Sequence, residues 1–489
     1  MKGLLQILFN KYGGTFSQIY VQIWTFPDRA DFIKTPKYHS NMMKHLSLFL
    51  CLLSLQAPGF SQSTAPLKIS EDQHFIVHDN GKPFFWLGDT AWELFHRTNR
   101  EEADLYLKNR AEKGYTVIQA VILAELDGLT VPSSNGEKPL INNDPAQPDE
   151  DYFKHVDYIV DKANELGMFI GMLPTWGDKF NKSWGVGPEV FTPANAYTFG
   201  KFLGKRYKDK AIIWILGGDR NPADEEDIEI IRKMAAGIRD EVGQDQLITM
   251  HPQGGSNSAT WFHEDEWLDL NMFQSGHGQK DNKNYQIAEK LYNLHPTKPV
   301  LDGEPAYEDH PINWKAENGW FDEFDSRRAG YWSMLAGACG HTYGNHNIWQ
   351  MWLPERNPVS QARTPWTQAL DYPGAFQAGY MKTFFEFLDW QKMIPNQEII
   401  LKGPQGSGMK ILAAMAADGS FVLAYTPYGS NFSLDLSQLS GDQISVSWFN
   451  PQIGESVKAG TMEKKETMDF DPPSDEKRGN DWVLVVKAM

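Results

Sequence analysis

The sequence predicts an α/β protein made of a (β/α)8 TIM barrel and a smaller C-terminal all-β sandwich domain. Over residues 67–390, short apolar runs alternate with stretches that have the 3.6-residue period of an amphipathic helix. This alternation is typical of parallel strands joined by crossover helices, and eight strand-and-helix units fit a closed barrel. After about residue 394 the helical period ends. Short strands separated by Gly, Asp, Asn and Pro then indicate a β-sandwich at residues 395–489.

The individual elements follow from the apolar runs, which mark strands, and from the 3.6-residue period, which marks helices. The predicted barrel strands, in chain order, are 84–88, 116–121, 168–173, 212–216, 247–250, 270–274, 299–302 and 341–343. The predicted helices are 100–113, 152–166, 194–207, 225–242, 285–294, 327–338 and 374–388. The predicted sandwich strands are 411–416, 421–425, 445–449 and 482–486.

The N-terminal segment predicts export. Residues 42–62 have the pattern of a secretory signal peptide, with Lys44 at the start, an apolar stretch over 46–55, and Gly59 and Ser61 as small residues at a cleavage site. We expect translation to start at Met42 or Met43, residues 1–41 to be an upstream extension, and the mature protein to be periplasmic or extracellular. A lipoprotein anchored through Cys51 is the less favoured alternative, because the preceding residue is a bulky leucine.

Composition excludes several classes of protein. The 63 acidic and 46 basic residues give a net charge of −17, which disfavours a broad nucleic-acid-binding face. Two cysteines, Cys51 and Cys339, cannot form a disulfide framework, and the longest apolar run is too short for a permanent membrane span. The 17 Trp, 18 Tyr and 28 Phe residues suit either sugar stacking or core packing.

Two carboxylates are the candidate catalytic residues. Asp219 and Glu304 each follow an apolar strand and a glycine, at the ends of predicted strands four and seven. Barrel enzymes carry their chemistry at these strand ends, and strands four and seven lie across the ring from each other. A pair of opposed carboxylates is what cleavage of a glycosidic bond requires. The alternative for Asp219 is a helix N-cap, because Pro222 and the acidic stretch 224–227 could begin a helix.

Other polar and aromatic residues near strand ends are candidate substrate contacts, and neither a metal nor an organic cofactor is expected. The histidines lack His-x-His or His-Glu-x-x-His spacing, and there is no Walker or Rossmann glycine pattern. The candidate substrate contacts are Asp89, Trp92, Trp176, His251, Gln274, His277, His341, Tyr343 and Trp349.

Four segments, 85–95, 217–221, 302–305 and 340–344, resemble the apiosidase-like catalytic domain, a relative of glycoside hydrolase family 140. The C-terminal region resembles the collagen-binding-type β-sandwich domain that often follows it. The resemblance implies an enzyme that cuts apiose-containing side chains of the pectin rhamnogalacturonan II. It also implies that Asp219 is the general acid/base and Glu304 the nucleophile. Related barrel glycosidases have Asn-Glu where this chain has Gly218-Asp219, which leaves retaining and inverting chemistry open.

These observations together predict an exported glycoside hydrolase that acts on an oligosaccharide or polysaccharide of the plant cell wall. Three alternatives stay open: a catalytically inactive carbohydrate-binding barrel, a glycosidase for another sugar such as an arabinofuranosidase or β-glycanase, and a metal-dependent hydrolase. The β-sandwich is expected to brace the barrel rather than to act as a mobile binding module, because the link over 391–396 is short.

Overall fold

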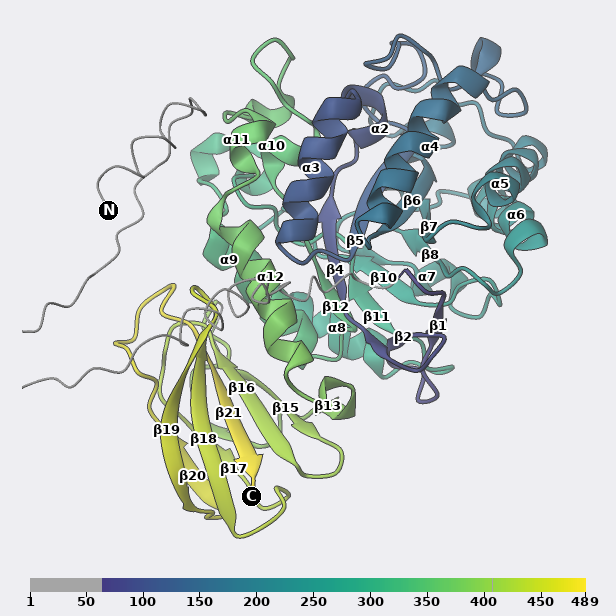
Figure 1. The fold of residues 1–489 in the computed structure, drawn as a ribbon. Coiled ribbons are helices and arrows are strands. Elements are labelled where there is room, and N and C mark those ends of the chain that lie inside the picture. Colours follow the sequence, from purple (N-terminus) through teal and green to yellow (C-terminus); the bar gives the residue numbers. More distant parts are fainter. Residues whose placement is uncertain (1–63, 407) are drawn as a thin grey trace, which may run out of the picture. The chain divides into compact units, whose positions relative to one another are not determined.

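A computed structural model describes residues 64–406 and 408–489, and it confirms the predicted architecture of a barrel followed by a β-sandwich (Figure 1). The predicted extension 1–41 and signal peptide 42–62 lie outside the described residues. The eight barrel strands are β4 (Trp86–Thr90), β5 (Val117–Leu123), β6 (Phe169–Thr175), β7 (Ile212–Gly217), β8 (Ile248–His251), β10 (Asn271–Gln274), β11 (Val300–Asp302) and β12 (Gly340–Tyr343).

The barrel strands follow one another around a ring. Six parallel strands pair in the order β12-β4-β5-β6-β7-β8, and β10 pairs with β11, also in parallel. Single hydrogen bonds close the two gaps: Asp269 N–H donates to the Ile248 carbonyl at 2.9 Å, and Cys339 N–H donates to the Val300 carbonyl at 2.9 Å. Strands β7 and β11 are therefore the fourth and seventh of eight, on opposite sides of the ring.

Helices cover the outside of the ring (Figure 1). Because both faces of a barrel strand are covered, its sequence is apolar throughout. In β5 all seven residues are buried and nearly all are apolar. The longer helices are α3 (Arg100–Glu112), α4 (Glu150–Glu165), α5 (Pro193–Tyr207), α6 (Glu225–Val242), α8 (Asn284–Tyr292), α9 (Glu323–Leu335) and α12 (Pro373–Glu386). The single-turn helices are α2 (Leu94–Arg97), α7 (Ala259–Phe262), α10 (His346–Trp349) and α11 (Trp366–Ala369). None of the helices in the described part of the chain has the length and apolar character needed to cross a bilayer.

Short strands that the sequence did not predict precede the barrel and lie beside it. The strands β1 (Leu67–Ile69), β2 (Ile76–His78) and β3 (Pro83–Phe84) form an antiparallel sheet, and β9 (Ser256–Asn257) pairs with β10. Two or three residues are too few to show a period of two, so such strands escape detection from sequence.

The sandwich consists of two antiparallel sheets. The six-stranded sheet has the order β13-β15-β16-β21-β18-β19, and the three-stranded sheet has the order β14-β17-β20. The strands of the first sheet are β13 (Met393–Pro395), β15 (Leu412–Ala416), β16 (Phe421–Thr426), β21 (Trp482–Ala488), β18 (Gln443–Asn450) and β19 (Glu455–Glu463). Those of the second are β14 (Ile400–Lys402), β17 (Phe432–Asp435) and β20 (Thr467–Phe470).

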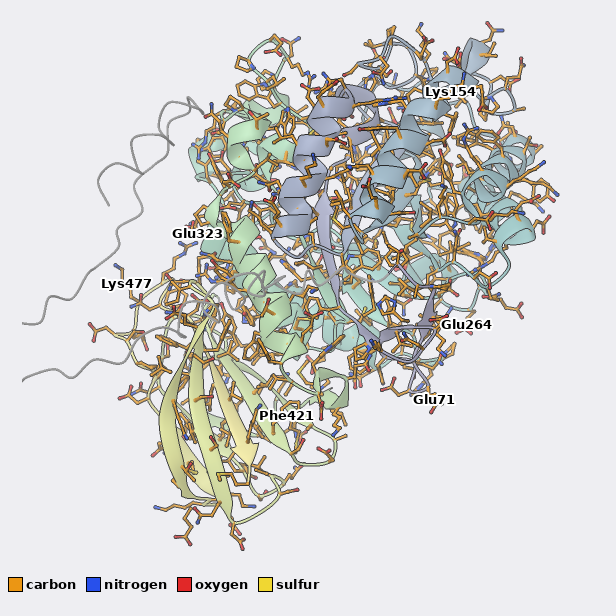
Figure 2. All side chains as sticks on the ribbon, in the orientation of Figure 1. Glu71, Lys154, Glu264, Glu323, Phe421 and Lys477 are labelled. Atoms are coloured by element: carbon orange, nitrogen blue, oxygen red, sulfur yellow. The ribbon has the colours of Figure 1, made fainter. Side chains whose placement is uncertain are left out.

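Helix α9 joins the barrel to the sandwich through ion pairs. Arg327 donates two hydrogen bonds to Asp481, from Nε at 2.8 Å and from Nη2 at 2.6 Å. Arg478 pairs with Asp322 at 2.6 Å and with Asp325 at 2.8 Å. Figure 2 labels Glu323 and Lys477, the chain neighbours of the residues in one of these pairs.

Apolar side chains also pack between the barrel and the sandwich. The rings of Tyr331 and Tyr425 stack with centroids 4.9 Å apart, and those of Phe384 and Phe449 stack at 4.4 Å. The barrel core continues into one face of the larger sandwich sheet. Separating the two parts would therefore expose both apolar area and buried charges.

Candidate active site

The chain reaches Asp219 through a turn that only glycine permits. Gly217 ends β7 and Gly218 follows it, with φ of +89° and +90°, and a Cβ on Gly218 would lie 2.7 Å from the Thr175 carbonyl oxygen. Asp219 itself has a left-handed φ of +51°. The helix-capping alternative for Asp219 is wrong, because α6 begins after Asp224, whose side chain accepts the cap hydrogen bond from Asp227 N–H at 3.1 Å.

Glu304 follows β11 and Gly303, and two histidines contact its carboxylate. His277 Nε2 lies 3.0 Å from Oε1 of Glu304 and donates to it. His251 Nε2 lies 3.2 Å from Oε2 in an ion-pair contact, at an angle that does not make a good hydrogen bond.

The backbone sets the tautomers of both histidines. Asp219 N–H donates to Nδ1 of His251 at 3.2 Å, and Tyr307 N–H donates to Nδ1 of His277 at 3.4 Å. Each Nδ1 is thus an acceptor, so in the neutral ring the hydrogen is on Nε2, facing Glu304. One imidazole, that of His251, links the Asp219 backbone to the Glu304 carboxylate.

The two carboxyl groups have opposite proton affinities. Burial is the largest cause that raises the pKa of Asp219, to about 7, and the negative charge of Glu304 also raises it, while His251 and Arg220 lower it. Burial also opposes ionisation of Glu304, but its contacts with His251 and His277 outweigh this effect and hold the pKa of Glu304 at about 2. Near neutral pH the site can therefore carry a proton on Asp219 and a charge on Glu304.

Both carboxyl groups open into a cavity of about 870 Å³ at the end of the barrel where the strands run into their loops. Trp92 and Trp176 lie against each other with ring centroids 5.2 Å apart, and Trp92 Nε1 donates to the Tyr307 hydroxyl at 3.1 Å. Trp176 Nε1, Gln274 Oε1 and Glu304 Oε2 have no hydrogen-bond partner among the described residues. All three atoms are buried, and they belong to residues that line the cavity.

Five of the nine predicted substrate contacts line this cavity with Asp219 and Glu304. They are Trp92, Trp176, Gln274, His277 and Trp349. His251 is fully buried behind the two carboxyl groups and does not line the cavity. Its position fits a residue that holds Glu304 rather than one that meets substrate.

The predictions for Asp89, His341 and Tyr343 are corrected by the structure, because all three are buried outside the cavity. Asp89 accepts hydrogen bonds from Arg110 Nε at 2.6 Å and from the Tyr106 hydroxyl at 2.5 Å, both on α3.

His341 lies 3.0 Å from where a Cβ on Gly330 of α9 would stand, and burial lowers its pKa to about 3. The Tyr343 hydroxyl donates to Glu308 at 2.6 Å. Side chains alternate along a strand, and these three point outward to the helices instead of toward the mouth of the barrel.

Several cavity residues were not among the predicted contacts. Glu125 lies just after β5, and burial together with the charge of Asp219 raises its pKa well above the usual range. Trp184 lies in a loop and Trp314 ends the short 3-10 helix Ile312–Trp314, both away from any strand end. Tyr307 could have been found from its position three residues after Glu304.

A (β/α)8 barrel with two carboxyl groups of opposite proton affinity at one cavity has the arrangement of a glycoside hydrolase. Comparison with known proteins agrees with this class and gives the family. The family described as "Apiosidase-like, catalytic domain" matches residues 70–392, and the chain belongs to this family. The family described as "Putative collagen-binding domain of a collagenase" matches residues 394–487.

Two solved structures are similar over both parts of the chain. One, titled "Glycoside hydrolase", is 31% identical with a TM-score of 0.80, over 87% of this chain and 97% of that chain. The other, a glycoside hydrolase family 5 protein from Bacteroides vulgatus, is 32% identical with a TM-score of 0.80, over 87% of this chain and 93% of that chain. The search of curated proteins found no match.

Proposed function

We propose that this glycoside hydrolase cleaves a glycosidic bond in plant cell-wall polysaccharide, with the apiosyl linkages of pectic rhamnogalacturonan II as its substrate class. The observation that carries the proposal is the pair formed by Asp219 and Glu304, whose pKa values of about 7 and about 2 divide them into an acid and a base at one cavity. The match to the apiosidase-like family supports the choice of sugar.

In the proposed reaction Asp219 is the general acid. Its proton passes to the oxygen of the glycosidic bond as the bond from that oxygen to the anomeric carbon breaks. The electron pair of the bond leaves with the oxygen, so the departing sugar becomes a neutral alcohol. A pKa near 7 leaves this proton available at neutral pH.

Glu304 supplies the opposing carboxylate. It either attacks the anomeric carbon, which gives a covalent intermediate and retention, or removes a proton from water, which gives inversion. His277, in the loop after β10, and His251, at the end of β8, keep the carboxylate ionised and hold it at the cavity. The anomeric configuration of the first product, followed by NMR, distinguishes the two courses.

The test is a screen of the purified protein against rhamnogalacturonan II and defined pectic oligosaccharides, with mass detection of the products. Asp219→Asn and Glu304→Gln should each abolish product release while unfolding as the unmodified protein does. Glu355→Gln, which alters an exposed carboxyl group outside the cavity lining, is the matched control and should leave activity unchanged. Full activity in either catalytic variant would overturn the assigned role. Release of another sugar would show that the substrate is a different glycan.

Export of the enzyme is also part of the proposal, on the grounds of the signal pattern at residues 42–62. Expression from Met42 in a bacterium should place the protein outside the cytoplasm, and the intact mass of the purified form should lack that segment. A cytoplasmic protein of full mass would refute export.

A further inference from the structure

We propose that Trp184 and Trp314 are two sugar-binding platforms, one on each side of the bond that is cleaved. Trp184 would bind the sugar that departs with the glycosidic oxygen, and Trp314 the sugar that carries the anomeric carbon. The inference rests on the proposed glycosidase reaction and deepens it, because it requires a substrate with rings on both sides of the scissile bond.

Exposure separates these two residues from the other tryptophans. Trp184 is 37% exposed and Trp314 is 46% exposed, and they are the two exposed tryptophans in residues 64–406 and 408–489. Both line the cavity that holds the carboxyl groups. By contrast Trp92 and Trp176 are 1% and 2% exposed and have most of their surface packed against protein. A large apolar ring left in water beside a catalytic cavity points to a ligand that covers it.

Trp184 is fixed beside Asp219 through the next residue in the chain. The guanidinium carbon of Arg220 lies 3.5 Å from the centroid of the Trp184 ring, and Arg220 Nη2 donates to the Trp184 carbonyl at 3.0 Å. The guanidinium covers one face of the indole, which leaves the opposite face for the cavity. A sugar stacked there would lie next to the proposed proton donor.

The loop that carries Trp184 is held by Asp178. One carboxylate oxygen of Asp178 pairs with Lys179 at 2.6 Å, and the other accepts the Gly187 N–H at 2.7 Å. Gly185 has φ of +92°, and a Cβ there would lie 2.7 Å from Asp178. The platform is therefore built before substrate arrives, which reduces the entropy lost on binding.

Trp314 is fixed beside Glu304 through histidines. Its ring meets that of His310 edge-on, with centroids 4.4 Å apart, and that of His277 at 5.8 Å. Asn313 N–H donates to the His277 carbonyl at 2.8 Å. Because His277 also donates to Glu304, the Trp314 ring is placed relative to the proposed nucleophile.

The backbone at Trp314 is strained in a way that packing alone does not explain. Asn313 and Trp314 have left-handed φ values of +53° and +61°. Such a conformation is unfavourable for a bulky residue, and it holds the indole out in water instead of burying it. Strain of this kind persists where a ligand clamp requires it.

Reaction chemistry assigns the two sides. The general acid protonates the oxygen that departs, so the leaving sugar lies toward Asp219 and thus toward Trp184. The carboxylate of Glu304 faces the anomeric carbon, so the sugar that carries this carbon lies toward Trp314. The C–H faces of a pyranose or furanose ring are apolar enough to stack on an indole, while the hydroxyl groups project from the rim of the sugar ring.

The test uses oxidation of tryptophan by N-bromosuccinimide on the full-length Glu304→Gln protein, mapped by peptide mass spectrometry. Oligosaccharides from rhamnogalacturonan II are the first probe, and arabinan, galactan, xylan and mannan oligosaccharides are the others. A bound oligosaccharide should shield both Trp184 and Trp314. Trp261 and Trp352 are half-buried and outside the cavity lining, so their oxidation should not change.

Affinity gives a second readout. Trp184→Ala and Trp314→Ala should each weaken binding of the shielding oligosaccharide roughly 10-fold or more, because loss of a well-packed Trp at a binding site commonly has this effect. Trp184→Phe keeps an aromatic face on Arg220 and should retain part of the affinity, which guards against misfolding of the Ala variant. Phe387→Ala removes an exposed ring that is 81% accessible and outside the cavity lining, and it should change nothing.

The outcomes separate this inference from the proposed function. Shielding of both tryptophans by a glycan other than rhamnogalacturonan II would retain the platforms and refute the pectic substrate. Cleavage of a pectic fragment with both tryptophans still freely oxidised would retain the function and refute the platforms. Shielding of Trp184 by the released sugar alone, or absence of shielding by every glycan tried, would also overturn the inference.

Discussion

Replacing Arg327 by Met would leave the carboxylate of Asp481 without its cation inside the protein. The two side chains are 2% and 0% exposed, and they share two hydrogen bonds of 2.8 and 2.6 Å. Breaking a buried pair from one side costs about 3–5 kcal/mol. The Tyr425 hydroxyl still donates to Asp481 at 3.0 Å, so we expect the lower end, about 3 kcal/mol.

The double variant Arg327→Met, Asp481→Leu should recover at least half of this loss, because it leaves no charge unpaired. Urea unfolding at pH 7, followed by tryptophan fluorescence, measures both free energies of unfolding. Lys154→Met breaks an exposed pair whose side chains are 62% and 64% accessible, and it should leave the free energy of unfolding nearly unchanged. The reasoning would be refuted if Arg327→Met were as stable as the Lys154→Met control. It would also be refuted if the double variant were no more stable than Arg327→Met alone.

Four further outcomes follow from the site and the fold. The pH profile of kcat/KM should be bell-shaped, with limbs near pH 2 from Glu304 and near pH 7 from Asp219. Activity requires Glu304 to be ionised and Asp219 to be protonated. Full activity maintained to pH 9 would contradict these roles. His277→Ala removes a hydrogen bond to the Glu304 carboxylate and should move the acid limb upward, whereas a purely structural effect would lower activity equally at every pH. Burial raises the pKa of Glu308 from 4.5 to about 7, so the folded state keeps a proton that the unfolded chain releases. Stability should therefore fall by on the order of 3 kcal/mol as pH rises from 4.5 to 7, and urea unfolding of Glu308→Gln across this range should lose that slope. Deletion of residues 395–489 should give an insoluble barrel, because the apolar face of α9 and α12 would be exposed; a soluble, active fragment would contradict the bracing role.

The fold was predictable where an element is long and has one clear period. Helix α6 spans the predicted range 225–242, since its acidic first turn and the Asp224 cap are visible in sequence. Strand β19 was not predicted, because seven of its nine residues are polar or small and give no apolar alternation. This edge strand is formed through its pairing with β18. Its existence depends on a partner strand rather than on its own side chains.

The site was predictable in part for a related reason. Asp219 and Glu304 could be found because strand ends of a parallel barrel gather at one mouth. Trp184 and Trp314 could not be found, because their positions depend on loop contacts with Arg220 and His310 that no local pattern encodes. Asp89 on β4 and His341 and Tyr343 on β12 lie near the mouth of the barrel, but their side chains point outward. The position of a residue at a strand end therefore does not predict where its side chain points.

His251 places one rigid, planar spacer between two strand ends. Its Nδ1 receives the Asp219 N–H, and its Nε2 meets the Glu304 carboxylate. An imidazole ring has no internal torsion, so the distance between its two nitrogen atoms is fixed. The loops that carry Asp219 and Glu304 are therefore held at a constant separation as long as both contacts persist. A flexible substitute such as glutamine could satisfy both contacts but would let the gap vary. If Asp219 and Glu304 have the proposed roles, the stereochemical course of the reaction would depend on a side chain that lies behind the cavity wall.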